Sequence, residues 1–196
     1  DRTAELVEAT LRAAHDATLA LGKVQPVQPP IADKRKAKAE IALIHATDWQ
    51  GSKVTPSYNT EIMQKRVMDF AKKVVRLTEI QRSHHPVKEC VVMFGGDMVE
   101  GLFNYPAQLW EIDLSLFDQF TTVARLEVDF VRYLLANFEK VTVVAEWGNH
   151  GRIGSKRDNV PKSDNVDRMT YALARAILRD EKRLFWEDGA EDIQRI

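Results

Sequence analysis

The chain has 196 residues, which is enough for one domain with a short appendage. Hydrophobic residues make up 44% of it and charged residues 29%, as in an ordinary globular protein, and the formal net charge of −1 argues against a general nucleic-acid coat. The single cysteine, Cys90, excludes a disulfide framework and indicates a small core residue in a reducing compartment. No stretch reaches the roughly 18 to 20 apolar residues of a membrane span, and no signal peptide is recognisable.

The first forty residues predict a helix followed by a linker. Residues 3–21 carry apolar side chains at helical spacing and Gly22 is a reasonable stop, so residues 1–22 are predicted to form an N-terminal helical appendage. Residues 23–40 are rich in proline and then in Lys and Arg, which is typical of a linker. The basic cluster consists of Lys34, Arg35, Lys36 and Lys38. It is either a solvated approach to a strand or a nucleic-acid patch. Because the chain opens on Asp1 and directly in helical pattern, we expect it to be a piece of a longer polypeptide or its ordered part.

Residues 41–196 are predicted to form the main domain, because strand and helix patterns alternate there. Apolar, β-branched runs predict strands over residues 41–47, 90–94 and 141–145, and the segment from residue 184 reads as one more strand and a turn. Amphipathic helices are predicted over residues 61–80, about 109–138, and 166–178. This alternation predicts an α/β fold with a parallel sheet at its core.

Polar residues follow each of the three predicted strands. Asp48 follows the first strand, Asp97 follows the second after two glycines, and Asn149 and His150 follow the third. Because ligands bind outside the carboxyl ends of parallel strands, we expect these side chains to lie close together. Carboxylate and amide oxygens suit divalent cations, and a cation relieves the repulsion between two carboxylates. Each motif alone is more typical of a turn or a helix cap, but their conjunction favours a site.

The blocks TDWQ, GGDMVEG and GNHGR, in this order, resemble the first three signature blocks of the calcineurin-like metallophosphoesterases. They are most similar to the DNA-repair-exonuclease-like phosphoesterases of phage and bacterial genomes, and the resemblance covers residues 41–152. It implies a four-layer α/β/β/α sandwich that is incomplete at the C-terminus of this chain. It also implies two divalent metal ions, with manganese favoured and magnesium, iron or zinc as alternatives, that activate a bridging hydroxide for attack on a phosphoester.

The resemblance also implies roles for individual residues. By position, Asp48 would bind the first metal, Asp97 would bridge both metals, and Asn149 would bind the second. His150 would act as general acid or stabilise the transition state. Gln50 stands where the family has a histidine, and its carbonyl oxygen favours manganese or magnesium at the first metal site.

Two features depart from the family pattern. No histidine follows His150, so the family's last two blocks are absent; either the chain is truncated, which we favour, or the protein has lost half of its metal ligands. His45 does not replace Gln50 as a ligand, because strand alternation places it on the opposite face from Asp48, and we expect a partly buried structural histidine.

Basic residues after the third block are candidate substrate contacts. Arg152 could hold a phosphate bidentately and assist catalysis, or it could face solvent. The same loop carries Lys156, Arg157 and Lys162, which are plausible contacts for a nucleic-acid backbone.

Four other residues have more than one interpretation. Glu100 is an acceptor that supports the site, an outer metal contact, or a surface turn residue. The pair Asn104–Tyr105 and Trp147 are either stacking surfaces for a base or packing residues.

The sequence therefore predicts a metal-dependent phosphoesterase acting on phosphodiester bonds, with a DNA exo- or endonuclease as the leading version. One alternative is an enzyme for a smaller substrate, such as a phosphoprotein or a cyclic nucleotide. Another is a non-catalytic binding module with a degenerate metal site. We expect a cytoplasmic protein (in the host cytoplasm if phage-encoded) that binds DNA and no membrane, and that forms a homo-oligomer or contacts a partner protein through its N-terminal region.

Overall fold

The computed structural model describes residues 8, 12, 24–154 and 161–188, so the predicted N-terminal helix lies almost entirely outside the described residues. The elements in chain order are β1 (Glu40–Ala46), α2 (Thr60–Arg82), β2 (Val87–Phe94), the 3-10 helix η1 (Gln108–Trp110), α3 (Leu116–Leu135), β3 (Lys140–Ala145), α4 (Val166–Ile177) and β4 (Leu184–Asp188). The predicted α/β class is confirmed, and so are the predicted strands.

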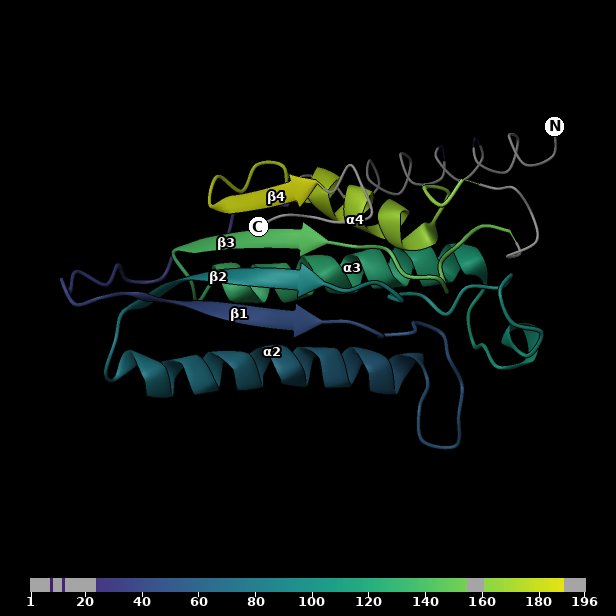
Figure 1. Ribbon diagram of the computed structural model, residues 1–196, viewed down its shortest axis with the longest axis horizontal. Helices are drawn as coiled ribbons and strands as arrows, with labels where there is room; N and C mark the ends of the chain where they lie inside the picture. The colour runs from purple at the N-terminus through teal and green to yellow at the C-terminus, as the bar shows by residue number, and fades with distance from the viewer. Residues whose placement is uncertain (1–7, 9–11, 13–23, 155–160, 189–196) are drawn as a thin grey trace.

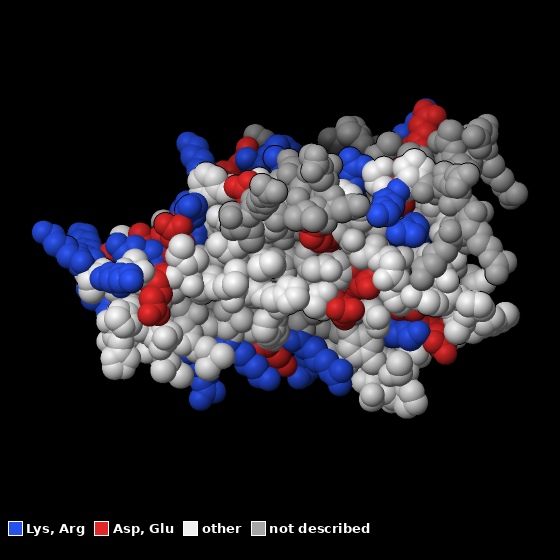
Figure 2. All heavy atoms as spheres, in the orientation of Figure 1, with Lys and Arg blue, Asp and Glu red and all other residues white. Residues whose placement is uncertain are grey.

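The four strands form one sheet in the order β1-β2-β3-β4, with every neighbouring pair parallel (Figure 1). Burial alternates along β1, because Ile44 and Ala46 are buried in the core while Ile41 and Leu43 are 61% and 68% exposed. The helices therefore cover one face of the sheet. The other face, turned toward the viewer, is largely uncharged over β1 to β3 (Figure 2).

An aromatic cluster fills the core beneath the carboxyl ends of the strands. The Trp49 ring is 5% exposed and packs edge-on against Phe94 and Phe130, with ring centroids 5.6 and 5.9 Å away. Phe94 in turn stacks on Tyr171 of α4 at 5.7 Å. Because buried aromatic pairs have restricted geometry, Trp49 anchors the loop that follows β1.

The helix predicted from about residue 109 starts later than expected. Residues 108–110 form only the 3-10 turn, and α3 begins at Leu116 with Ser115 as its N-cap, whose side chain accepts from Asp118 N. The amides of Asp113 and Leu114 donate instead to Ser52 Oγ, at 3.1 and 2.8 Å. These bonds hold the chain in a non-helical path, so the apolar spacing over residues 109–114 was misleading.

The proline-rich segment has neither helix nor strand from residue 24 to residue 39, as expected of a linker, yet it is tied to the domain. Arg183 donates to Val27 O at 2.9 Å, and Asp33 N donates to Glu139 Oε1 at 2.9 Å. Arg35 pairs with Asp33, and this contact lowers the pKa of the Asp33 carboxyl to about 2. The remaining basic side chains of the cluster are exposed, which fits a solvated approach to β1.

Cys90 lies in β2 and is 1% exposed. Burial raises the pKa of its thiol to about 12, so it is an inert core residue, as predicted. Among the described helices, none is sufficiently long and apolar to cross a membrane.

Candidate functional site

The carboxyl ends of three neighbouring strands lie at the same level. Ala46 of β1 pairs with Phe94 of β2, and Phe94 pairs with Ala145 of β3. The ladder continues one step further, since Gly95 N donates to Ala46 O and Glu146 N donates to Phe94 O. All three candidate loops therefore begin at one edge of the sheet, as the sequence predicts.

The loops after β1 and β2 run side by side. Asp48 N donates to Gly96 O at 3.1 Å, and Gln50 N donates to Asp97 O at 2.9 Å. Asp48, Gln50 and Asp97 all have positive φ, at 55°, 43° and 52°. Non-glycine residues seldom adopt this conformation, aspartate more often than most, and residues in it are enriched at functional sites. Ser52, with φ of 87°, is the remaining example among the described residues.

The loop after β3 packs directly on the Asp97 carboxylate. His150 N donates to Asp97 Oδ1 at 2.7 Å. Two glycines permit this approach, because a Cβ on Gly148 would overlap Asp97 and a Cβ on Gly96 would overlap Gly148. The GGD and GNH motifs thus form a single packed unit.

The side chain of His150 is held by Glu100. Its Nδ1 atom lies 3.2 Å from both the carbonyl oxygen and Oε2 of Glu100, and Glu100 itself is 1% exposed. Interaction with this carboxylate raises the pKa of His150, although burial acts in the opposite direction. Lys53 Nζ lies 3.2 Å from the other carboxylate oxygen. Glu100 is therefore buried beside His150, and the prediction of a surface turn residue was wrong.

The remaining predicted residues lie around this unit. Asn149 Nδ2 donates to the Tyr105 hydroxyl at 3.1 Å. Arg152 is half-buried, and within the described part of the chain its Nε atom is buried without a hydrogen-bond partner. Lys156 and Arg157 lie outside the described residues.

His45 differs from its prediction. It is exposed rather than partly buried, and its Nε2 would be 2.8 Å from a Cβ on Gly95. The reason is that its neighbours along β1, Ile41 and Leu43, lie on the open face of the sheet, and alternation places His45 with them.

Asp167, which is not among the residues predicted from the sequence, joins two of the loops. Its fully buried carboxylate accepts from Asp97 N and Gly148 N, each at 2.9 Å, and also from Met98 N and Val99 N. Burial raises the pKa of Asp167 to about 6, against the lowering effect of these N–H donors. The signal in the sequence was an acidic residue in the first turn of α4, after the N-cap Asn165.

Glu127 is a second buried acid below the site. It interrupts the apolar stripe of α3, is 0% exposed, and accepts from Thr170 Oγ1 at 2.8 Å. Burial, with a smaller contribution from the charge of Asp167, raises its pKa well above the usual value.

We expect Glu127→Gln to stabilise the protein at alkaline pH. A raised folded-state pKa contributes stability that is complete below the unfolded-state pKa and is lost as pH rises through the folded-state pKa. The uncharged glutamine removes this loss, so the variant should match the wild type near pH 4 and exceed it by about 1 kcal/mol or more at pH 8. Thermal melts of both proteins across this pH range measure the difference. If the stability of the two proteins depended on pH in the same way, the raised pKa of Glu127 would be contradicted.

The donor set fits hard divalent cations. Asp48, Asp97, Asn149 and Gln50 contribute two carboxylates and two amide carbonyls from adjoining loops, and oxygen donors of this kind suit manganese or magnesium better than zinc. Within the described ranges, no group of three or more His, Cys, Asp and Glu side chains is arranged to hold a metal ion. Any cation here would therefore depend on the amide oxygens.

Comparison of the chain with protein-family models, curated proteins and solved structures found no match. The likeness to the metallophosphoesterases therefore rests on the three sequence blocks.

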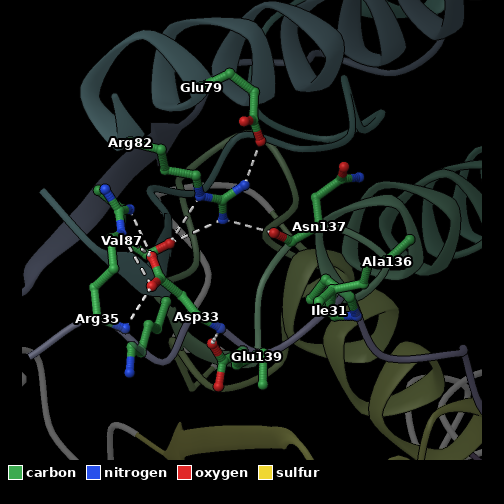
Figure 3. A pocket seen from close by; sticks show the side chains of 12 residues that line it. Ile31, Asp33, Arg35, Glu79, Arg82, Val87, Ala136, Asn137 and Glu139 are labelled. Carbon is green, nitrogen blue, oxygen red and sulfur yellow. Dashed lines mark hydrogen bonds and ion pairs between the residues drawn. The ribbon is translucent and has the colours of Figure 1, made fainter. Parts of the chain in front are cut away.

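A separate hollow of about 470 Å³ lies near the start of β2 (Figure 3). Arg82 occupies its centre, donates to the carbonyl oxygens of Val87 and Asn137, and pairs with Glu79. Asp33 and Arg35 pair with each other at its rim. Asp33 N and the Arg35 side chain also donate to Glu139 Oε1 and His85 O, so contacts at this hollow hold the linker against the domain.

Proposed function

We propose that this protein is a metal-dependent phosphoesterase that hydrolyses phosphodiesters, with DNA as the substrate class. The observation that carries the proposal is the convergence of Asp48, Asp97 and the Asn149–His150 pair at one sheet edge, where His150 N bonds to Asp97 Oδ1. The positive φ values of Asp48 and Asp97 add independent support, since strain of this kind persists where function requires it.

Asp48, Gln50, Asp97 and Asn149 would hold the cations, which when bound supply charge neutralisation at the phosphate and an activated water. The chain's own contribution is to fix these donors. The bonds from the amides of Asp48 and Gln50 to the loop after β2 set the spacing of the two carboxylate-bearing loops.

His150 is proposed to protonate the leaving oxygen. Its Nδ1 side faces Glu100, and the raised pKa of its ring favours the protonated form that a general acid requires. Arg152, whose Nε atom lacks a hydrogen-bond partner among the described atoms, is proposed to bind a phosphate oxygen.

The proposal includes the two-sheet sandwich of the metallophosphoesterases. The described residues form a single sheet, and its open face carries the exposed apolar side chains Ile41, Leu43 and Phe185. A second sheet in this fold would pack on that face.

We expect His150→Gln to slow the hydrolysis of substrates with poor leaving groups more than that of substrates with good leaving groups. DNA cleavage releases an alkoxide that needs a proton, whereas bis-p-nitrophenyl phosphate releases a stable phenolate. The hydrolysis rate of the variant should fall by about 100-fold or more on single-stranded DNA and by far less on the nitrophenyl ester. His85→Gln, distant from the site near the start of β2, is the matched control and should lose neither activity. Equal losses on both substrates would contradict the general-acid role.

A substrate panel tests the function itself. The full chain with added manganese is offered bis-p-nitrophenyl phosphate, single-stranded DNA and a phosphopeptide, and we expect hydrolysis of the first two. Cleavage of the phosphopeptide without cleavage of DNA would overturn the nuclease assignment. Hydrolysis of none of the three would overturn the enzymatic assignment and favour a binding module.

A further inference from the structure

The loop between β2 and η1 is fastened onto the turn that carries Asn149 and His150. Asn104 Nδ2 donates to Asn149 O at 2.6 Å and to His150 O at 3.2 Å. Gln108, which is 1% exposed, accepts through Oε1 from the backbone amides of Asn104 and Tyr105, at 2.9 and 3.1 Å. The backbone at Tyr105 is therefore fixed relative to the turn.

Tyr105 contacts both functional side chains of that turn. Its hydroxyl accepts from Asn149 Nδ2 at 3.1 Å, and its ring lies against the His150 ring with centroids 5.1 Å apart. These contacts involve different parts of Tyr105, so a single substitution can separate them.

In the structure the Tyr105 hydroxyl contacts the NH₂ end of the Asn149 amide. An asparagine side chain has a carbonyl oxygen at one end and an NH₂ group at the other. With the NH₂ group on Tyr105, Oδ1 is the end left to coordinate a cation. In the reverse orientation the NH₂ group would face the cation, and its positive partial charge would be repelled.

We propose that Tyr105 is a positioning residue that orients Asn149 for metal binding through its hydroxyl group. The inference rests on the proposed function, since it assigns a partner to one of the metal-binding residues. Groups that orient metal ligands in this way commonly change metal affinity 10- to 100-fold when they are removed.

The test is calorimetric titration of manganese into the full-chain wild type and Tyr105→Phe. Phenylalanine removes the hydroxyl and keeps the ring against His150. We expect manganese affinity to fall roughly 10-fold while the melting temperature stays unchanged. Tyr133→Phe, on the core-facing side of α3, is the matched control and should bind as the wild type does.

Three outcomes separate this inference from the proposed function. Weaker binding in Asn149→Ala but wild-type binding in Tyr105→Phe would overturn the role of Tyr105 alone. Absence of both manganese binding and hydrolysis in the wild type would overturn the proposed function together with the inference. The side-chain NH₂ resonances of Asn149 give a readout that needs no metal: we expect them to shift in Tyr105→Phe and not in Tyr133→Phe, and unchanged resonances would also overturn the inference.

Discussion

Asp97→Asn is expected to abolish manganese-dependent hydrolysis while leaving the fold intact. Asparagine tolerates the positive φ of 52° at this position and retains an oxygen that can accept from His150 N. It removes the negative charge that is proposed to bridge two cations. Because loss of several kcal/mol of charge stabilisation corresponds to a factor of about 1,000 in rate, we expect at least this decrease on bis-p-nitrophenyl phosphate.

The matched control for this substitution is Asp69→Asn. Asp69 is a partly exposed carboxylate of α2 that pairs with Lys65 and Lys72, away from the strand ends. Its replacement should leave the rate unchanged, and melting curves of both variants check the fold. An Asp97→Asn protein that keeps more than a tenth of the wild-type rate would contradict the proposed role of Asp97.

Among the substitutions proposed for this protein, Asp167→Ala is expected to cause the largest loss of stability. Four backbone N–H groups donate to this fully buried carboxylate, and each unsatisfied buried donor costs about 1 to 3 kcal/mol. Allowing for partial relaxation, the free energy of unfolding should fall by about 3 to 5 kcal/mol. Because two of the donors are the amides of Asp97 and Gly148, manganese binding should weaken as well.

Asp164→Ala is the comparison for this second substitution. Asp164 lies three residues earlier. Its backbone N–H donates to Pro161 O and its backbone carbonyl accepts from Ile153 N, and an alanine would keep both bonds. Denaturant unfolding should place Asp164→Ala within about 0.5 kcal/mol of the wild type. A loss below about 1 kcal/mol in Asp167→Ala would show that the loops after β2 and β3 are held by other contacts.

The strands and the meeting of their loops could be predicted from the sequence. Runs such as Cys90–Phe94 are apolar on both faces, which indicates strands of a parallel sheet. Parallel strands bring Asp48, Asp97 and Asn149 to one edge. Glycine before Asp97 and Asn149 indicated close backbone approach, and Gly96 and Gly148 do lie in contact.

The contacts between distant segments could not be predicted in this way. Glu100 and Asp167 are acidic residues in a turn and a first helical turn, where exposure is usual, and only the converging loops bury them. The start of α3 was missed because the apolar spacing from Leu109 imitates a helix, while the bonds that prevent one come from Ser52, about sixty residues earlier in the chain.

Calorimetric titration of manganese into the wild-type chain and Asp97→Asn tests the central claim most directly. The proposed site predicts saturable binding in the wild type that is at least 10-fold weaker in Asp97→Asn and unchanged in Asp69→Asn. Absence of binding in the wild type, or equal binding in the wild type and Asp97→Asn, would contradict the assignment of a metal site to this edge of the sheet.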